Sequence, residues 1–407
     1  MLTLDFWKPK GDRLLWISVL VLATASLVFI YSSTGKLTFR KNDGMTSYYL
    51  WKQIILLGMG YVVIAFFQNF SCRKYLNFAG TILFVCIILL LVAMMFGSEK
   101  NGAGRWMPMP FGLSFQPSEL AKLATVMYVA RDISYNQSEK GYHFDIWRWL
   151  LPIATIVIIF MENVSTAVLL ASTCFIMVFV GRLPWKTTLK TVGSALAGVV
   201  VLLALILAVP ESAMQAHEDM LGRIPTLQSR ILHFMDEQPL EEMEFQEIMD
   251  NQSIQSRIAI ASGGLLGKGP GNSTQCNILP EPYSDFIFAI ILEELGVSGL
   301  LIIILCYVFL LITAFRIMFR CKSLSLGLFV VGIAVCLVLQ AIIHMSVSVG
   351  IIPVTGQTLP LVSKGGTSTL IVAMEIGMIL SVSREVDREM KAEAEEAAEE
   401  EVVEEDA

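Results

Sequence analysis

Charged residues are scarce in this chain. They make up 16% of its 407 residues, whereas 55% of the residues are hydrophobic. An average soluble domain carries about 25% charged residues, so this lack of charge excludes a soluble protein. Seven cysteines and four histidines are present, but they show neither a disulfide framework nor the ligand spacing of a metal site.

The hydrophobic residues gather in blocks of about 20, the length that an α-helix needs to cross the ~30 Å hydrocarbon core of a bilayer. We predict an all-α, polytopic membrane protein with about ten transmembrane helices and a large extracytoplasmic loop, 210–285, before the eighth. The segments begin near Leu14, Tyr48, Tyr75, Leu120, Trp149, Val164, Leu189, Phe286, Leu324 and Thr367. No internal repeat is evident, which weighs against an inverted-repeat transporter.

The flanking basic residues predict the orientation. Basic residues lie just before the first segment, within 8–13, and just after the last, within 384–391, which places both termini in the cytoplasm. The membrane domain is then 14–384, after a short N-terminus at 1–13. The tail, 385–407, holds a run of like charge: without the nine acidic residues of the last fifteen positions, the net charge changes from −7 to +2. We predict a disordered, solvated tail.

The unusual sequence lies in the loops that this orientation places outside. Residues 97–117, 210–285 and 350–366 are long, polar and contain glycine and proline. The last of them has two prolines and four glycines before the final helix. Such a backbone is non-helical, and at membrane depth it is tolerated only where it lines a cavity. A plain connecting loop is the alternative.

Ionisable residues cluster near the first of these loops. Arg105 precedes Pro117, Glu119 and Lys122. Proline suits the first turn of a helix, so Glu119 and Lys122, three residues apart, share one face within pairing distance. A local ion pair without further consequence is the alternative.

A second cluster runs from Gln255 and Ser256 through Arg257 to Lys268, with glycines on both sides of the lysine. The glycines allow close backbone approach to a ligand, and the two basic side chains could meet phosphate oxygens. The spacing is not that of a P-loop, and no strand precedes it. A flexible surface loop is the alternative.

Asp285 stands directly before an apolar helix. Capping the helix N-terminus is the commonest use of such an aspartate. Its position at the outer membrane surface, beside a glycine-rich basic loop, also suits a general base that acts on a lipid-linked substrate. Glu293 and Glu294 follow more than two turns later, so they must face the bundle interior or water, and we expect them to form structural hydrogen bonds.

In this order the clusters resemble the SEDS family (shape, elongation, division and sporulation), which includes the FtsW, RodA and SpoVE proteins. The resemblance extends from about Leu14 to Arg384, and Pro353–Gly356 is more similar to the division and sporulation branch than to the elongation branch. The motifs that carry it are Arg105-Trp106, Phe115-Gln116-Pro117-Ser118-Glu119, Ala121-Lys122, Gln255-Ser256, Gly263-Gly264, Leu279-Pro280-Glu281, Asp285-Phe286-Ile287-Phe288-Ala289, Glu293-Glu294-Leu295-Gly296, Leu359-Pro360, Ser363 and Gly365-Gly366. The family usually has tyrosine where this chain has Lys364.

The resemblance implies a GT-C-like bundle that polymerises lipid II into glycan strands at the outer face of the cytoplasmic membrane, during septal cell division. The family's proposed catalytic carboxylate falls on Asp285. The substrate-binding candidates are Arg105, Glu119, Lys122, Gln255, Ser256, Arg257, Lys268, Ser363 and Lys364. Basic side chains of this set would stabilise the leaving pyrophosphate.

No cofactor is certain from the sequence; a divalent cation, Mg²⁺ or Mn²⁺, could share the work of the basic side chains, although no dedicated cage is visible. The expected partners are lipid II, undecaprenyl-linked glycan, a class B penicillin-binding protein transpeptidase and other divisome membrane proteins, without nucleic acid. Three alternatives stay open: a lipid II flippase, an elongation-type polymerase, and a membrane scaffold that recruits a transpeptidase.

Overall fold

The structure, a computed structural model, describes residues 4–34, 47–96, 98–100, 103–108, 114–138, 141–142, 146–181 and 251–405. The described chain is mostly helical, with short strands and with irregular segments at 264–286 and 350–366. The helices are α1 (Leu4–Trp7), α2 (Arg13–Ser33), α4 (Ser47–Phe67), α5 (Cys72–Asn77), α6 (Ala79–Phe96), α7 (Pro117–Asn136), α8 (Ile146–Glu162), α9 (Val164–Val180), α15 (Gln252–Gly263), the 3-10 helix η2 (Gln275–Asn277), α16 (Ile287–Leu295), α17 (Val297–Arg320), α18 (Leu324–Val349) and α19 (Thr367–Glu405). The strands are β1 (Ser98–Lys100), β2 (Ala103–Pro108), β3 (Ser114–Phe115), β4 (Gln137–Ser138) and β5 (Gly141–Tyr142). They form two small antiparallel sheets, one of order β1-β2-β3 and one of β4 with β5.

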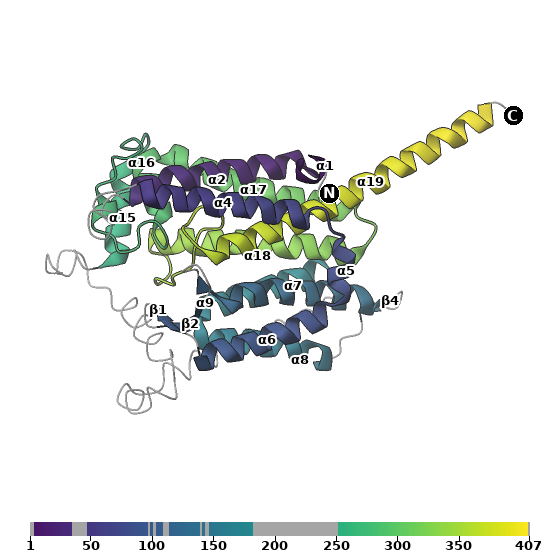
Figure 1. Cartoon of the computed structure of the whole chain (residues 1–407), viewed down its shortest axis with the longest axis horizontal. Helices are drawn as coiled ribbons and strands as arrows, with labels where there is room; N and C mark the ends of the chain where they lie inside the picture. The colour runs from purple at the N-terminus through teal and green to yellow at the C-terminus, as the bar shows by residue number, and fades with distance from the viewer. Residues whose placement is uncertain are drawn as a thin grey trace.

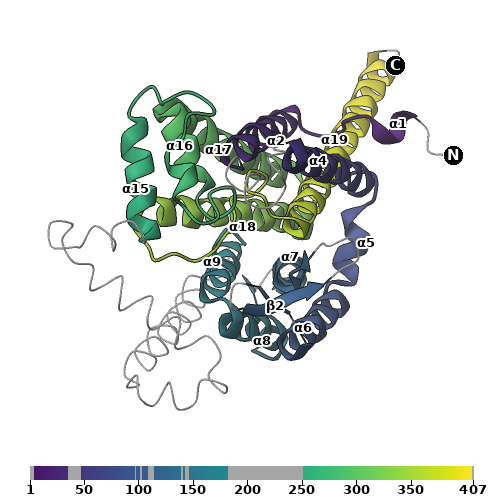
Figure 2. The ribbon, with the colours of Figure 1, turned by 60° about the vertical axis from the view of Figure 1, so that its left-hand side comes forward.

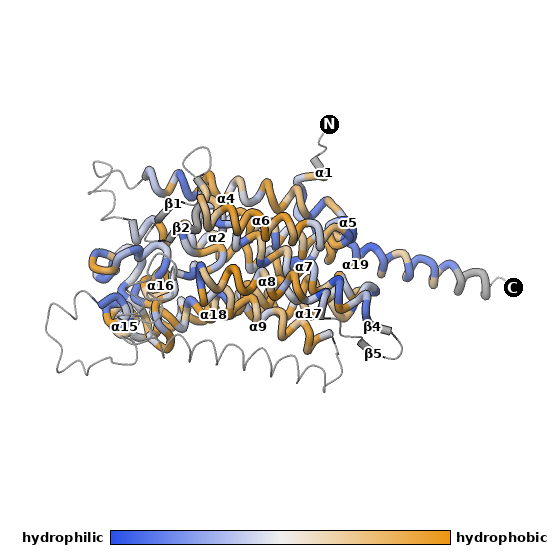
Figure 3. Tube along the Cα trace, turned by 90° about the horizontal axis from the view of Figure 1, so that it is seen from below, coloured by the Kyte–Doolittle hydropathy of each residue, from blue (hydrophilic) through white to orange (hydrophobic). Residues whose placement is uncertain are grey.

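The long helices lie side by side in one bundle (Figure 1). Among the described residues, α2, α4, α6, α17 and α18 are long and apolar enough to cross a membrane. Figure 3 shows hydrophobic residues along the length of the bundle and hydrophilic ones toward its ends. The prediction of an all-α, multi-pass membrane protein is therefore confirmed. The predicted segment near Leu189 lies outside the described residues.

Sequence signals explain where individual helices begin and end. Asp12 caps α2, because its carboxylate accepts hydrogen bonds from the backbone N–H groups of Leu14 and Leu15 at 2.8 and 3.3 Å. This satisfies donors that have no partner inside the helix. At the far end of α18, Gly350 adopts a left-handed conformation with φ of 82°, the usual way to stop a long helix.

The apolar segment predicted to begin near Phe286 is divided in the structure. Helix α16 ends at Leu295, and α17 begins at Val297 after Gly296, which has a φ of 61°. A Cβ at Gly296 would lie 2.6 Å from the backbone nitrogen of Gly267, so the break needs glycine both for its conformation and for its space. Glu293 and Glu294 therefore lie in the last turn of a short helix and not within a spanning one.

Helix α18 lies at the centre of the bundle. It packs against α17, α7, α9, α15 and α19, and most of its side chains are buried. Figure 2 shows α6, α7, α8 and α9 grouped on one side of it and α2, α4, α17 and α19 on the other. Residues on α18 can therefore contact both groups of helices.

The two ends of the bundle differ. Helices α15 and α16 and strands β1 and β2 lie at one end, which we call the α15–α16 end, whereas α1 and the extension of α19 lie at the opposite end (Figure 1). The opposite end is held by ion pairs of Arg73 with Glu385, at 2.5 Å, and of Arg316 with Asp12, at 3.3 Å. Lys10 also donates to Asn69 there, at 2.8 Å.

The acidic tail differs from its prediction. We expected disorder from residue 385, but α19 continues as helix to Glu405. A helix that extends an existing one avoids the cost of nucleation, and alanine, glutamate and lysine favour helix. Side chains 391–399 are exposed, and Glu393 forms an exposed ion pair with Lys322.

We predict that a chain ending at Lys391 keeps the thermal unfolding midpoint of the full chain in detergent. The removed ion pair is more than half exposed on both sides, at 61% and 53%, and such pairs contribute about 1 kcal/mol or less. Val386→Ala is the matched control, because Val386 lies on the same helix but is 3% exposed; it should lower the midpoint. A truncation that lowers the midpoint as much as Val386→Ala would show that the tail packs against the bundle.

Candidate functional site

The non-helical segment 350–366 joins α18 to α19 and forms the centre of the candidate site. As predicted, it contains no helix. Its later part is buried, with Leu359 at 1%, Val362 at 0% and Ser363 at 2% exposure. A buried backbone without helical hydrogen bonds needs other partners for its polar groups.

Side chains of the surrounding helices supply those partners. The Nδ1 of His344 lies 2.8 Å from the carbonyl oxygen of Gln357, and because that oxygen can only accept, Nδ1 carries the proton. Gln340 Nε2 donates to the carbonyl of Thr358 at 3.0 Å. The hydroxyl of Tyr307, on α17, donates to the carbonyl of Pro360 at 2.7 Å. The bundle thus holds the segment through buried hydrogen bonds.

Gln340, His344 and Tyr307 were missed as site residues by the sequence analysis. A signal was available on α18, because Gln340, His344 and Ser348 recur every four residues in a helix whose other polar side chains are those of Ser325 and Ser346. That spacing places polar groups on one face. No comparable signal marks Tyr307.

Glu119 and Lys122 form the predicted pair on one face of α7. Lys122 Nζ lies 2.9 Å from Glu119 Oε2, and the two side chains are 2% and 9% exposed. Pro117 stands in the first turn, as expected. Lys122 also donates to Gln340 Oε1 at 2.8 Å, and Gln340 in turn holds Thr358. The buried pair is therefore connected to the non-helical segment.

The backbone of Arg105 lies in β2, but its side chain is outside the described part of the structure. Strand β2 pairs with β3 through Met107 and Phe115, and α7 follows directly. The structure therefore places the chain around Arg105 near the start of α7, without showing what its guanidinium contacts.

Residues 255–257 on α15 meet the start of the non-helical segment. The hydroxyl of Ser256 donates to the carbonyl of Ser348 at 2.7 Å, and Gln255 is buried. Arg257 lies against Gly350, where an added Cβ would approach its Cδ within 3.1 Å. Ser256 thus contacts the end of α18 and Arg257 the first residue of the non-helical segment, whereas Lys122 reaches that segment through Gln340 at Thr358.

The glycines of the second cluster approach α16 and not an open site. A Cβ at Gly263 would lie 2.0 Å from the carbonyl oxygen of Leu292, and one at Gly267 would lie 2.2 Å from that of Glu294. The backbone N–H groups of Lys268 and Gly269 donate to the carbonyls of Glu293 and Glu294, each at 2.9 Å. The glycines therefore allow the loop to cap the C-terminal turn of α16, whose carbonyls have no partner inside the helix.

The side chain of Lys268 also contacts the C-terminal turn of α16. Its Nζ lies 2.6 Å from Glu293 Oε1 and donates to Thr274 Oγ1 at 3.0 Å. The Glu293 carboxylate also accepts from the backbone of Thr274, at 3.0 Å, and from the hydroxyl of Ser273. Burial would raise the pKa of Glu293, but the hydrogen bonds from Lys268, Ser273 and Thr274 hold that pKa below its ordinary value. The expected structural role of Glu293 is confirmed, and Lys268 lies at the other end of α16 from Asp285.

Asp285 lies in a turn just before α16. Phe286 takes the N-cap position, so Asp285 stands one residue outside the position expected for a cap. Its backbone N–H donates to the carbonyl of Glu281 at 3.1 Å, and the Ser284 hydroxyl donates to its Oδ1 at 3.1 Å. The carboxylate is half-buried, whereas Phe286 and Phe288, which anchor the helix start, are each 1% exposed.

Ser363 and Lys364 hold the turn of Asp285. The Ser363 hydroxyl donates to the carbonyl of Ser284 at 2.8 Å, and the Lys364 backbone N–H donates to that of Tyr283 at 3.0 Å. Three predicted site residues are thus brought together, although Asp285 is 78 residues before Ser363 and 79 before Lys364 in the sequence. The turn is fixed on one side by α16 and on the other by the end of the non-helical segment.

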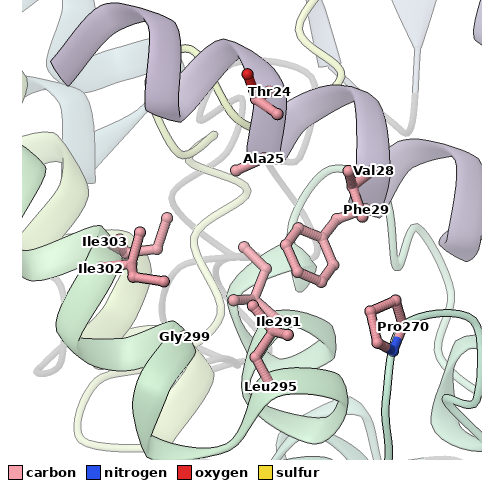
Figure 4. A pocket seen from close by; sticks show the side chains of 10 residues that line it. All are labelled: Thr24, Ala25, Val28, Phe29, Pro270, Ile291, Leu295, Gly299, Ile302 and Ile303. Carbon is pink, nitrogen blue, oxygen red and sulfur yellow. The ribbon is translucent and has the colours of Figure 1, made fainter. Parts of the chain in front are cut away.

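In the described part of the chain no metal site accompanies these residues, and a cavity between the helices is apolar. Among the described residues, no group of three or more His, Cys, Asp or Glu side chains is arranged to hold a metal ion. A cavity of about 190 Å³ lies between α2, α16 and α17 (Figure 4). Hydrocarbon lines almost all of it, including Phe29, Ile291 and Leu295, so it offers no group for acid–base chemistry.

The fold and the site define an integral membrane protein whose buried polar residues converge on a non-helical segment that reaches the α15–α16 end of the bundle. A family model for the FtsW, RodA and SpoVE proteins, described as "Cell cycle protein", matches residues 12–388. The chain therefore belongs to this family.

Named relatives agree with this assignment. The chain is 31% identical over 388 residues to stage V sporulation protein E of Bacillus subtilis (strain 168), covering 93% of this chain and 98% of the relative. It is 29% identical over 390 residues to peptidoglycan glycosyltransferase MrdB of Escherichia coli (strain K12), covering 93% and 95%. A solved chain from work on the structural coordination of polymerization and crosslinking by a peptidoglycan synthase complex has a TM-score of 0.67 and 23% identity, covering 92% of this chain and 98% of that chain.

The buried pair gives a prediction about stability. Lys122→Met leaves Glu119 buried without its cation, so we expect a loss of about 3–5 kcal/mol in the free energy of unfolding. The double variant Glu119→Leu/Lys122→Met removes both charges and should be more stable than the single one. Unfolding in detergent measures both. Arg131→Met is the control, since Arg131 is exposed on the same helix; strictly additive losses in the double variant would show that the pair does not act as a unit.

Proposed function

We propose that this protein is a peptidoglycan glycosyltransferase, which polymerises lipid II into glycan strands. The observation that carries the proposal is the position of Asp285: a half-buried carboxylate on a turn that Ser363 and Lys364 fix against the non-helical segment. A general base needs this kind of fixed carboxylate within reach of a substrate proton. The printed name of the MrdB relative supports the reaction class.

In the proposed reaction Asp285 accepts the proton of the GlcNAc 4-hydroxyl of the acceptor lipid II. The freed oxygen forms a bond to the anomeric carbon of the lipid-linked MurNAc of the growing chain. The bond between that carbon and the pyrophosphate breaks, and undecaprenyl pyrophosphate departs with the bonding electrons. The configuration at the anomeric carbon is inverted, because the oxygen attacks from the face opposite the leaving group.

The basic side chains of the predicted set receive different roles in this proposal. We assign Arg105, Arg257 and Lys364 to the leaving pyrophosphate, where fixed cations stabilise developing charge. Lys122 and Lys268 each have a carboxylate partner. We infer that the ion pair of Lys122 with Glu119 keeps the bundle interior polar beside the non-helical segment. We also infer that Lys268 holds its own loop against the C-terminal turn of α16. Gln255, Ser256 and Ser363 then shape the walls around the substrate.

The proposal also includes an orientation and a partner. We infer that the α15–α16 end faces outward from the bacterial cytoplasmic membrane and that both termini are cytoplasmic. Clustered basic residues at the opposite end, such as Arg73 and Arg316, support this under the positive-inside rule. We further propose a class B penicillin-binding protein as the partner, supported by the similarity to a chain of a peptidoglycan synthase complex. A septal role is proposed separately, from the resemblance of Pro353–Gly356 to the division and sporulation branch.

Asp285→Asn tests the general base. An amide keeps the size of the side chain and can still accept from the Ser284 hydroxyl, but it cannot take up a proton, so we expect polymer formation to fall at least about 100-fold, in line with general-base contributions. Purified protein with fluorescent lipid II, followed by gel separation of glycan strands, measures this. Asp387→Asn, at an exposed position on α19, should stay fully active. Wild-type amounts of polymer from Asp285→Asn would remove Asp285 from the mechanism.

Cysteine labelling tests the orientation. In a chain without Cys276 and Cys321, we expect Asn277→Cys to react with a membrane-impermeant thiol reagent in intact cells and Glu399→Cys to react only after lysis. Both positions are exposed, so access alone decides the result. Labelling of Glu399→Cys in intact cells would reverse the orientation and with it the placement of the site.

A further inference from the structure

The side chain of Lys364 connects three segments that are far apart in the sequence. Its Nζ lies 4.3 Å from the ring centroid of Tyr49 and 4.5 Å from that of Tyr283. Tyr49 is in the first turn of α4, and Tyr283 is two residues before Asp285. Lys364 itself stands at the end of the non-helical segment.

Both distances are well inside the range of about 6 Å in which a cation is attracted to the face of an aromatic ring. Lys364, Tyr49 and Tyr283 are half-buried, so water screens the interaction less than at an open surface. Burial raises the pKa of Tyr283, and nearby Glu281 raises that pKa further, so the ring next to the ammonium is a neutral phenol. The ring of Tyr48 packs edge-on against that of Tyr49, with the ring centroids 5.4 Å apart.

The contact of the Lys364 ammonium with the rings of Tyr49 and Tyr283, which we call the bridge, adds a connection that the backbone does not make. Hydrogen bonds already join the turn of Asp285 to residues 363 and 364. Helix α4, however, packs mainly against α19 and α2. Through Lys364, the ring of Tyr49 ties the outermost turn of α4 to the turn that carries Asp285.

We propose that Tyr49 is a positioning residue for the glycosyl transfer: through Lys364 it holds the Asp285 turn in the orientation that the general base needs. This inference rests on the function proposed above. Tyr49 itself need not touch the substrate. Loss of Tyr49 would lower the rate by letting the Asp285 carboxylate move, because a misplacement of about 1 Å at a reacting group can lower a rate about 100-fold.

The primary test measures the turn and needs no catalysis. The backbone N–H groups of Ser284 and Asp285 both donate to the carbonyl of Glu281, at 3.0 and 3.1 Å, so their hydrogen exchange reports on how firmly the turn is held. We expect exchange of these amides to be roughly three- to ten-fold faster in Tyr49→Leu and in Lys364→Met, as for loss of one cation–π interaction. The double variant should exchange no faster than either single variant, because both remove the same bridge.

Conservative variants separate the bridge from general damage. Tyr49→Phe keeps a ring, and Lys364→Arg keeps a cation, so both should retain slow exchange, and Tyr49→Phe should also retain wild-type polymerisation. Tyr31→Leu is the matched control, since Tyr31 is an exposed tyrosine on α2. In Tyr49→Leu we expect kcat to fall several-fold, while KM for lipid II stays the same, because the loss concerns orientation of the base and not substrate binding.

The outcomes decide between the inference and the function on which it rests. Wild-type exchange at Ser284 and Asp285 in Tyr49→Leu would overturn the bridge. Faster exchange with unchanged kcat would overturn the positioning role. If the wild-type protein itself makes no polymer, the proposed function fails, and the exchange rates still report on the bridge.

Discussion

The buried, non-helical backbone of residues 350–366 is the constraint on which the rest of the site depends. A peptide group that lacks a hydrogen-bond partner inside a membrane bundle destabilises the fold by several kcal/mol. The bundle meets this need with Tyr307, Gln340 and His344, whose side chains bond to three carbonyls between Gln357 and Pro360. Polar residues therefore occur in otherwise apolar helices at the points where the segment passes.

The same contacts bring the chemically useful residues together. Gln340 accepts from Lys122 while it donates to Thr358, so the buried ion pair of α7 and the segment support each other. At the end of the segment, Ser363 fixes the turn of Asp285. The segment is linked to the ion pair through Gln340 and to the turn of Asp285 through Ser363. A shift in the backbone of the segment would therefore move both the ion pair and the carboxylate.

The sequence predicted what depends on local spacing. The approximate starts of the long helices other than α17 followed from apolar runs, and the pair of Glu119 with Lys122 followed from a three-residue separation on a helix. The break at Gly296 was missed, because the apolar run on both sides hides it and its cause is a contact with Gly267. The meeting of Lys364 with Tyr49 and Tyr283 joins three segments that are distant in the sequence, so no local pattern could predict it. The helical tail was missed because its charge pattern resembles disorder.

The measurement that tests the central claim most directly is reconstitution of the wild-type protein in lipid vesicles that contain fluorescent lipid II. Glycan products and the sidedness of the label are read from the same sample, with the orientation of the protein fixed by protease access to the loop around Asn277. We predict glycan strands formed at the membrane face that carries the α15–α16 end. Transfer of labelled lipid II across the bilayer without any strand formation would contradict the account.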